Sequence, residues 1–249
     1  MARSYICDMT EGLFTLSDLQ TTTVERIPTG LRRLDKVLGR GFVRRSLTLF
    51  AGHAGAGKSS LLTLISGRIS AAGRKVLYIS AEEDLSQFGL RARRLRLKAD
   101  DFLFITDDAR IDSLRKNALA LKPELLIIDS IQSLRYSDEG SPCLENMRSA
   151  RHLLAELLEL KKELDTAIVL VGHETKGHEI SGSAQLQHMV DLVLKLDYEE
   201  TTGDRVLTVK KNRFASITSN YRFIMGKHGE IQDAPPVPVV NYRSPIIVG

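Results

Sequence analysis

The segment GHAGAGKS at Gly52–Ser59 constrains this chain of 249 residues more than any other feature. It matches the pattern G-x-x-x-x-G-K-[S/T] in full, and it lies between an apolar run, Leu47–Ala51, and a helical pattern, Lys58–Ser70. A glycine-rich turn between a strand and a helix lets backbone N–H groups point at one anion, and the helix N-terminus adds a favourable dipole. The segment therefore predicts a phosphate-binding loop in an α/β domain.

The loop and the residue after it supply the predicted nucleotide contacts. These are Gly52, His53, Ala54, Gly55, Ala56, Gly57, Lys58, Ser59 and Ser60. We expect Lys58 to neutralise the β- and γ-phosphates of ATP and the Ser59 hydroxyl to coordinate Mg²⁺. The alternative is a strand-to-helix turn that binds nothing, and the matching context on both sides disfavours it.

Apolar runs alternate with helical patterns along most of the chain. Strands are predicted at Leu47–Ala51, Val76–Ser80, Phe102–Thr106, Leu125–Asp129, Ala167–Gly172, Leu192–Leu196 and Val206–Val209. Helices are predicted at Lys58–Ser70, Leu85–Leu97, Ile111–Leu121 and Leu144–Leu164. This order predicts an α/β fold with a mostly parallel sheet flanked by helices. Tyr221–Met225 and Glu230–Ile231, joined by a GKHG turn, predict antiparallel strands at the C-terminal edge.

The domain organisation follows from composition. We expect an N-terminal arm at 1–25, one ATPase domain at 26–232 and a Pro-rich tail at 233–249. The net charge of +4 permits nucleic-acid binding without arguing for it. Cys7 and Cys143 lie far apart and in no metal-ligand spacing, which favours a reducing compartment. No apolar run reaches membrane-spanning length, so we expect a cytoplasmic protein without membrane contact.

Acidic residues follow two of the predicted strands. Asp129 ends the apolar run LLIID, where a carboxylate can hold Mg²⁺ opposite Ser59. Glu82 and Glu83 follow Val76–Ser80, where a carboxylate can orient the water that attacks the γ-phosphate. The spacing does not choose between Glu82 and Glu83, and both are also compatible with ordinary acids at a helix N-terminus.

Several longer segments resemble the RecA-like ATPase domain of the bacterial RadA (Sms) family. They are RIPTGLRRLDKVLGRGF, YISAEED, LRARRLRL, IIDSIQSL, VGHETKG, LQHMVDLVL and KNRF. The resemblance implies a RecA-like core that assembles into rings, usually hexamers. It also implies DNA-dependent ATP hydrolysis that moves or remodels single-stranded DNA in recombination or repair, with helicase activity as one form. A recombinase or replication protein is a further expected partner.

The resemblance assigns roles to single residues. Glu82 matches the family's water-activating glutamate, and His173 falls where RecA-like proteins keep a γ-phosphate sensor. Lys211 and Arg213 in KNRF match a pair that reaches a neighbouring subunit's nucleotide. The simpler alternatives are a strand-end histidine for His173 and a solvated basic strand end for the pair.

The resemblance also implies two DNA-binding loops, at Arg135–Arg148 and Thr175–Gln187. Arg135, Arg148 and Lys176 are their candidate phosphate contacts. The run RARRLRLK at Arg91–Lys98 is more basic, but we interpret it as the solvated face of a helix.

The chain departs from the family in several places. The family's four-cysteine zinc module and its protease-like domain do not occur in these 249 residues, and Ala215 follows KNRF where the family has glycine. The modest charge and acidic first loop also fit a KaiC-type signalling ATPase that binds protein partners and not DNA. A third reading is a nucleotide-bound scaffold without turnover. ATPase rates with and without single-stranded DNA distinguish the three.

Overall fold

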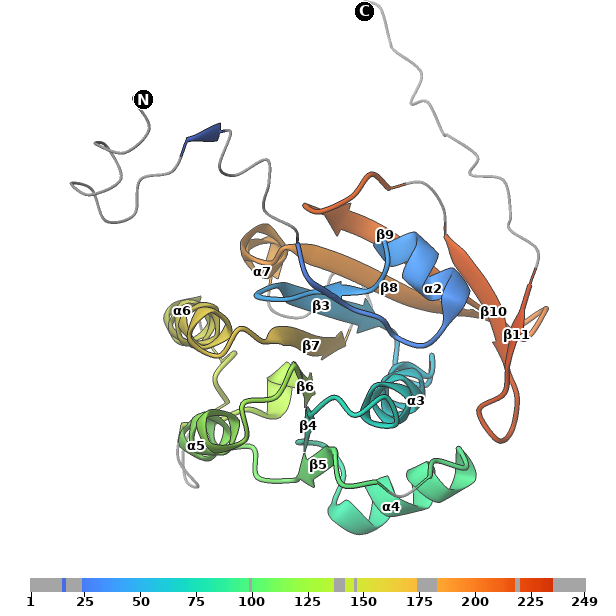
Figure 1. Ribbon diagram of the computed structural model, residues 1–249, viewed down its shortest axis with the longest axis horizontal. Helices are drawn as coiled ribbons and strands as arrows, with labels where there is room; N and C mark the ends of the chain where they lie inside the picture. The colour runs from blue at the N-terminus through green and yellow to red at the C-terminus, as the bar shows by residue number, and fades with distance from the viewer. Residues whose placement is uncertain are drawn as a thin grey trace, which may run out of the picture.

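The computed structural model describes residues 15–16, 24–98, 100–136, 142–145, 147–173, 183–217 and 220–234. Within these residues a nine-stranded sheet has the order β11-β10-β9-β8-β3-β7-β6-β4-β5 (Figure 1). The parallel part comprises β3 (Leu47–Gly52), β4 (Val76–Ser80), β5 (Leu103–Thr106), β6 (Leu125–Asp129), β7 (Ala167–His173) and β8 (Leu192–Glu199). The antiparallel part adds β9 (Asp204–Asn212), β10 (Tyr221–Met225) and β11 (Ile231–Asp233).

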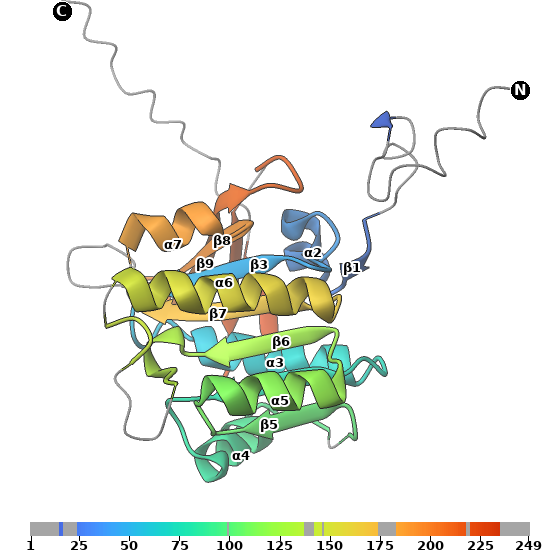
Figure 2. The same cartoon turned by 90° about the vertical axis from the view of Figure 1, so that its left-hand side faces the viewer.

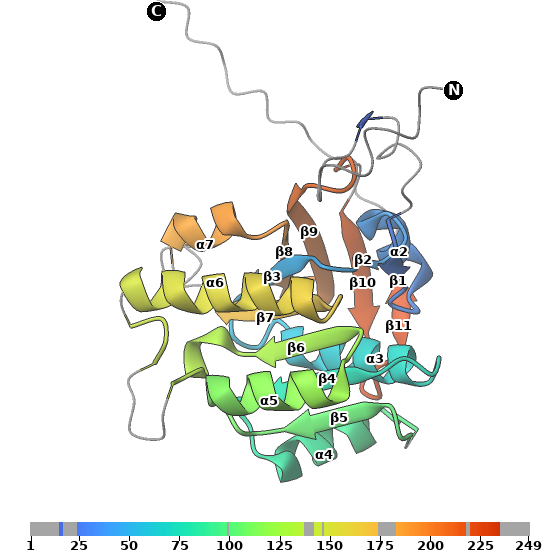
Figure 3. The same ribbon diagram turned by 60° about the vertical axis from the view of Figure 1, so that its left-hand side comes forward.

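Helices cover both faces of the sheet, as Figures 2 and 3 show. One face packs against α2 (Arg32–Leu38), α3 (Lys58–Ser70) and α4 (Leu85–Arg94). The other packs against α5 (Ile111–Leu121), α6 (Met147–Glu163) and α7 (Ser183–Met189). The central strands are apolar on both sides because both sides are buried. None of the described helices is long and apolar enough to cross a membrane.

The predicted α/β fold is confirmed, including the antiparallel C-terminal edge. The bounds predicted for β4, β6, β10, α3 and α5 match the structure, and the other predicted strands and helices differ at their ends. The GKHG turn is also present, with Gly229 at φ 78° and the N–H of Gly226 donating to the carbonyl of Glu230 at 2.8 Å.

Several short elements escaped sequence-based prediction. Three of them precede the phosphate-binding loop: β1 (Arg26–Ile27), α2 and β2 (Phe42–Val43). They lie in the segment RIPTGLRRLDKVLGRGF, which we used only for its resemblance to the family and for which we predicted no strand or helix. The predicted second DNA loop was extended too far, because Ser183–Met189 is α7. Leu186 of α7 is fully buried against the sheet, and this packing outweighs the polar composition of the segment.

A buried carboxylate links the start of the sheet to the helices behind it. Asp191, just before β8, accepts from the Lys161 ammonium of α6 at 2.6 Å and from the backbone N–H of Leu47 in β3 at 3.0 Å. Its other oxygen accepts from Arg213 at 3.0 Å. Burial alone would raise the pKa of Asp191, but these hydrogen bonds hold it below its ordinary value.

The Asp191→Asn substitution should destabilise the fold by about 3–5 kcal/mol, because it leaves the buried Lys161 charge without its partner. Urea unfolding at pH 7, followed by circular dichroism, measures this change. Asp197→Asn is the matched control on β8. Its carboxylate pairs with Lys195 at 3.2 Å but is 40% exposed, so its loss should cost less than about 1 kcal/mol.

The pH dependence of the free energy of unfolding tests whether the ionised Asp191 carboxylate is the cause of this loss. A carboxyl with a lowered folded pKa contributes stability above its unfolded pKa, about 3.9, and loses that contribution as the pH falls through the folded value. The difference between the wild-type chain and Asp191→Asn should therefore be constant from about pH 5 to 7 and shrink below about pH 4. Equal losses for Asp191→Asn and Asp197→Asn would contradict this account.

Candidate functional site

The predicted phosphate-binding loop joins β3 to α3 through strained glycine positions. Gly52 has φ 152°, and a Cβ there would lie 2.2 Å from the carbonyl oxygen of Leu196 on β8. Gly57 has φ 96° at the N-cap of α3, and a Cβ there would lie 2.8 Å from the Arg205 side chain. Both positions therefore require glycine, and the loop lies directly against β8 and β9.

The Lys58 ammonium is held inside the loop. The side chain is buried at the first residue of α3, and its Nζ donates to the carbonyls of Gly52 and His53, each at 2.8 Å. These carbonyls keep the ammonium at the centre of the loop. A phosphate oxygen that replaced them would gain a charge-assisted hydrogen bond from a cation already in place.

Strand register brings distant residues to the loop. Gly52 at the end of β3 pairs with His173 at the end of β7, and Ser80 at the end of β4 pairs with Asp129 at the end of β6. Because these strands are parallel, their carboxyl ends meet at one edge of the sheet.

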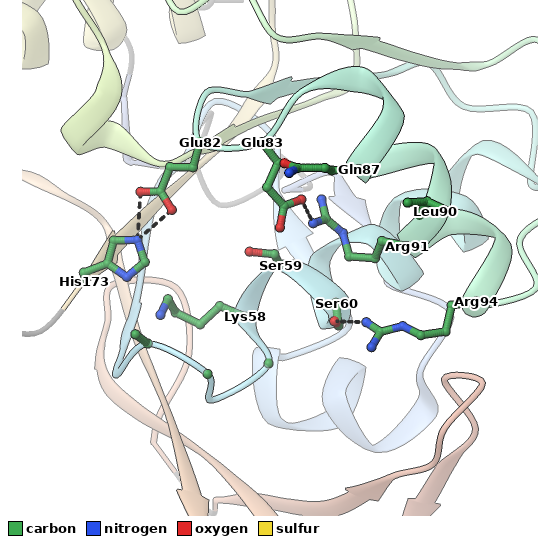
Figure 4. A pocket seen from close by; sticks show the side chains of 13 residues that line it. Lys58, Ser59, Ser60, Glu82, Glu83, Gln87, Leu90, Arg91, Arg94 and His173 are labelled. Atoms are coloured by element: carbon green, nitrogen blue, oxygen red, sulfur yellow. Dashed lines mark hydrogen bonds and ion pairs between the residues drawn. The ribbon is translucent and has the colours of Figure 1, made fainter.

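A pocket of ≈ 570 Å³ opens at this edge. It is lined by Ala54, Gly55, Gly57, Lys58, Ser59, Ser60, Glu82, Glu83, Gln87, Leu90, Arg91, Arg94 and His173. Figure 4 shows the Lys58 side chain between the Glu82–His173 pair and the arginines of α4. The structure thus brings together most of the predicted loop residues with Glu82 and His173.

Glu82 is an ionised acceptor in this pocket. The Nε2 atom of His173 lies 2.9 Å and 3.1 Å from its two carboxylate oxygens, and the Ser130 hydroxyl donates to Oε1. A carboxylate only accepts, so Nε2 of His173 carries the proton in this pair. The hydrogen bond from His173 is the main cause that lowers the pKa of Glu82, with Ser130 and the Lys58 charge adding to it against the effect of burial.

Glu83 has a different environment. Its carboxylate pairs with the Arg91 guanidinium, which is 7% exposed. Asp84 caps α4, because its side chain accepts from the backbone N–H of Gln87 at 2.8 Å. Glu82 is therefore the acid that faces His173 and Lys58, while Glu83 is neutralised by α4.

Asp129 ends β6, where it pairs with Ser80 of β4, and it is buried. The Tyr78 hydroxyl donates to its Oδ2 at 2.6 Å, and burial and this carboxylate raise the pKa of Tyr78 well above its ordinary value. Its Oδ1 atom is buried and has no hydrogen-bond partner among the described residues. A buried acceptor left without a donor is costly, so this oxygen would suit a water bound to a Mg²⁺ ion that the Ser59 hydroxyl would help to hold.

Lys211 and Arg213 lie at the opposite end of the strands from the pocket, where β8 begins. Lys211 pairs with Val193 near the start of β8, and its ammonium donates to the carbonyls of Gln187, His188 and Val190 at 2.7–3.0 Å. Arg213 donates to the His188 carbonyl and to Asp191. The pair holds the C-terminal end of α7 and is separated from this chain's own loop by the length of β3.

The structure describes two of the three predicted DNA contacts. Arg135 is half-buried and its backbone bridges to Arg110 and Pro142, whereas Arg148 is exposed in the first turn of α6. The predicted helix start at Leu144 is wrong, since α6 begins at Met147. Lys176 lies outside the described residues.

Sequence reasoning missed the α4 wall of the pocket. Gln87, Leu90, Arg91 and Arg94 line it, although we interpreted the basic run of α4 as a solvated face. The apolar spacing of Phe88 and Leu95 was the available signal, because it places Arg91 on the buried side of α4.

The fold and the site together define a P-loop ATPase domain with a RecA- and KaiC-like architecture. Residues 14–179 match the model of the AAA domain family, and the chain belongs to that family. It is a homologue of the DNA repair protein RadA.

The chain is 35% identical over 224 residues to the DNA repair protein RadA of Listeria monocytogenes, an alignment that covers 90% of this chain and 49% of the relative. It is 37% identical to RadA of Streptococcus pneumoniae over 224 residues, 90% of this chain and 53% of the relative. The chain therefore spans about half the length of these curated relatives. A KaiC-like protein of Pyrococcus horikoshii shares the fold, with a TM-score of 0.69 at 20% identity over 86% of this chain and 100% of that one.

The two neighbouring glutamates should differ in their effect on ATP turnover. Glu82→Gln should preserve ATP binding and lower kcat by roughly two to four orders of magnitude, as expected for loss of a general base. Glu83→Gln is the matched control, and it should lower kcat far less because its carboxylate is neutralised by Arg91. Steady-state phosphate release and equilibrium ATP binding measure the two effects. A silent Glu82→Gln beside a damaging Glu83→Gln would reverse the assignment.

Proposed function

We propose that this chain is a DNA-dependent ATPase that acts on single-stranded DNA in recombination or repair, and that it works as a homo-oligomeric ring. The observation that carries the proposal is the convergence of Lys58, Ser59, Glu82 and His173 in one pocket. The resemblance to RadA proteins along nine-tenths of the chain supports the DNA-repair setting.

In the proposed reaction Lys58 binds the β- and γ-phosphate oxygens in place of its own loop carbonyls. Glu82 accepts a proton from the attacking water, and its lowered pKa keeps it ionised at neutral pH. His173 orients that carboxylate and lies where it can contact the γ-phosphate. Mg²⁺, held by Ser59 and through water by Asp129, would neutralise charge on the phosphates.

The proposal also assigns Lys211 and Arg213 to a neighbouring subunit's nucleotide. Both lie at the edge of the sheet remote from their own loop, so only another copy's pocket is available to them. A contact between opposite edges of two copies is head-to-tail, and such contacts close into rings or continue as filaments. Cations supplied in this way would stabilise the charge on the transferred phosphoryl group.

DNA should stimulate hydrolysis. We expect the ATPase rate to rise several-fold with single-stranded DNA and the stimulation to fall steeply with salt, since phosphate contacts release counterions. Phosphate release is measured with single-stranded DNA, with duplex DNA and without DNA, at two salt concentrations. An active but unstimulated enzyme would favour the KaiC-type signalling role, and an inactive one would favour the scaffold.

Mixed variants test the shared active site. Lys58→Ala and Arg213→Ala should each be inactive alone. A mixture should regain partial activity, because some interfaces then combine an intact Lys58 with an intact Arg213. Since Arg213 also contacts Asp191, thermal unfolding must show that Arg213→Ala remains folded. Lys210→Ala, an exposed neighbour on β9, is the control and should retain activity alone. A folded Arg213→Ala variant with wild-type activity would contradict the assignment of Arg213 to a neighbouring subunit's nucleotide. A mixture that regains no activity would contradict it as well.

A further inference from the structure

Helix α4 presents a cation to the pocket that has no carboxylate partner among the described residues. Arg94, in the last turn of α4, donates from Nη2 to the Ser60 hydroxyl at 3.1 Å. Both residues line the pocket (Figure 4). An exposed guanidinium whose partner here is a neutral hydroxyl retains its full positive charge and several unused N–H donors.

Arg91 fixes α4 in this position. Its Nε donates to the Thr63 hydroxyl of α3 at 2.9 Å, and its guanidinium lies 5.0 Å from the centre of the Phe88 ring. It also pairs with Glu83, and its Nη2 is buried without a hydrogen-bond partner in the described chain. Arg91 is therefore a positioning residue that holds α4 against α3. Because the two helices are held together, the backbone of Arg94 stays close to Ser60, although the Arg94 side chain itself is exposed.

The position of Arg94 indicates which part of a nucleotide it meets. In the proposed mechanism Glu82 orients the attacking water, which would place the γ-phosphate beside the Glu82–His173 pair. In a phosphate-binding loop of this type the α- and β-phosphates follow along the backbone N–H groups toward the first turn of the helix. Ser60 belongs to that turn, two residues beyond Lys58 and away from Glu82.

We propose that Arg94 contacts the α-phosphate of the bound nucleotide, with the Ser60 hydroxyl holding the guanidinium in place. This inference rests on the proposed ATPase function and adds a binding residue to that site. A guanidinium can bind two phosphate oxygens at once, which makes it well suited to this task. Because the α-phosphate does not react, the contact is the same in ATP and ADP and supports binding more than the chemical step.

The test compares two adjacent arginines on one helix. Arg94→Ala should raise the Kd for both ADP and ATP by about tenfold, the size expected for a lost charge-assisted hydrogen bond, and leave kcat at saturating ATP within about twofold of wild type. Arg94→Lys should fall between. Arg93→Ala is the control, because Arg93 lines a separate groove between α4 and β5 and should bind both nucleotides as the wild-type chain does. Calorimetric titration gives Kd, and phosphate release gives kcat.

Binding of inorganic tripolyphosphate distinguishes a contact with the α-phosphate from a contact with the ribose or the base. Its third phosphate takes the α position without a nucleoside, so Arg94→Ala should weaken its binding by a similar factor. Weakened nucleotide binding with unchanged tripolyphosphate binding would overturn the α-phosphate assignment. So would an Arg94→Ala chain that binds ADP within twofold of wild type. If the wild-type chain itself fails to bind ATP, the proposed function fails instead.

Discussion

Parallel strand pairing in one register is the constraint on which the site depends. The pairs Gly52–His173 and Ser80–Asp129 place the ends of four strands at one edge, although these residues span more than 120 positions of the sequence. A slip of one residue in either pairing would turn each strand's side chains to the other face of the sheet. The two apolar cores on either side of the sheet prevent such slips, so the same packing that stabilises the fold also fixes the geometry of the pocket.

The charged groups divide between the two edges of this sheet. At the carboxyl edge, Lys58, Glu82 and His173 form a pocket in which each charge already has a protein partner. At the other edge, Asp191 and the carbonyls of α7 hold Arg213 and Lys211. In the proposed ring these edges face each other in adjacent copies. In that ring Lys211 would exchange carbonyl oxygens for phosphate oxygens, as proposed for Lys58, and this exchange would link the end of α7 to the occupancy of a neighbouring site.

The sequence was sufficient for the elements with strong local signals. The glycines of Gly52–Ser59 and the apolar runs of β4 and β6 specify their own conformations, so the loop and the strand bounds followed directly. The role of α4 in lining the pocket could not be predicted in this way, because a basic run does not show which face of its helix is buried. Packing decides this, and here Arg91 is buried against Phe88 and Thr63. Helix α7 was not predicted for a related reason. Its short polar segment is stabilised as a helix by the burial of one leucine, Leu186, and by hydrogen bonds from Lys211, which lies far along the chain.

The central claim is that the pocket at the carboxyl edge binds the triphosphate of ATP between Lys58 and Glu82. The most direct measurement is a crystal structure of this chain with Mg²⁺ and a non-hydrolysable ATP analogue. The account predicts that the Lys58 ammonium leaves the Gly52 and His53 carbonyls for phosphate oxygens, with the γ-phosphate beside Glu82 and His173. A triphosphate bound elsewhere, or a Lys58 that still donates only to its loop carbonyls beside a fully occupied pocket, would contradict it.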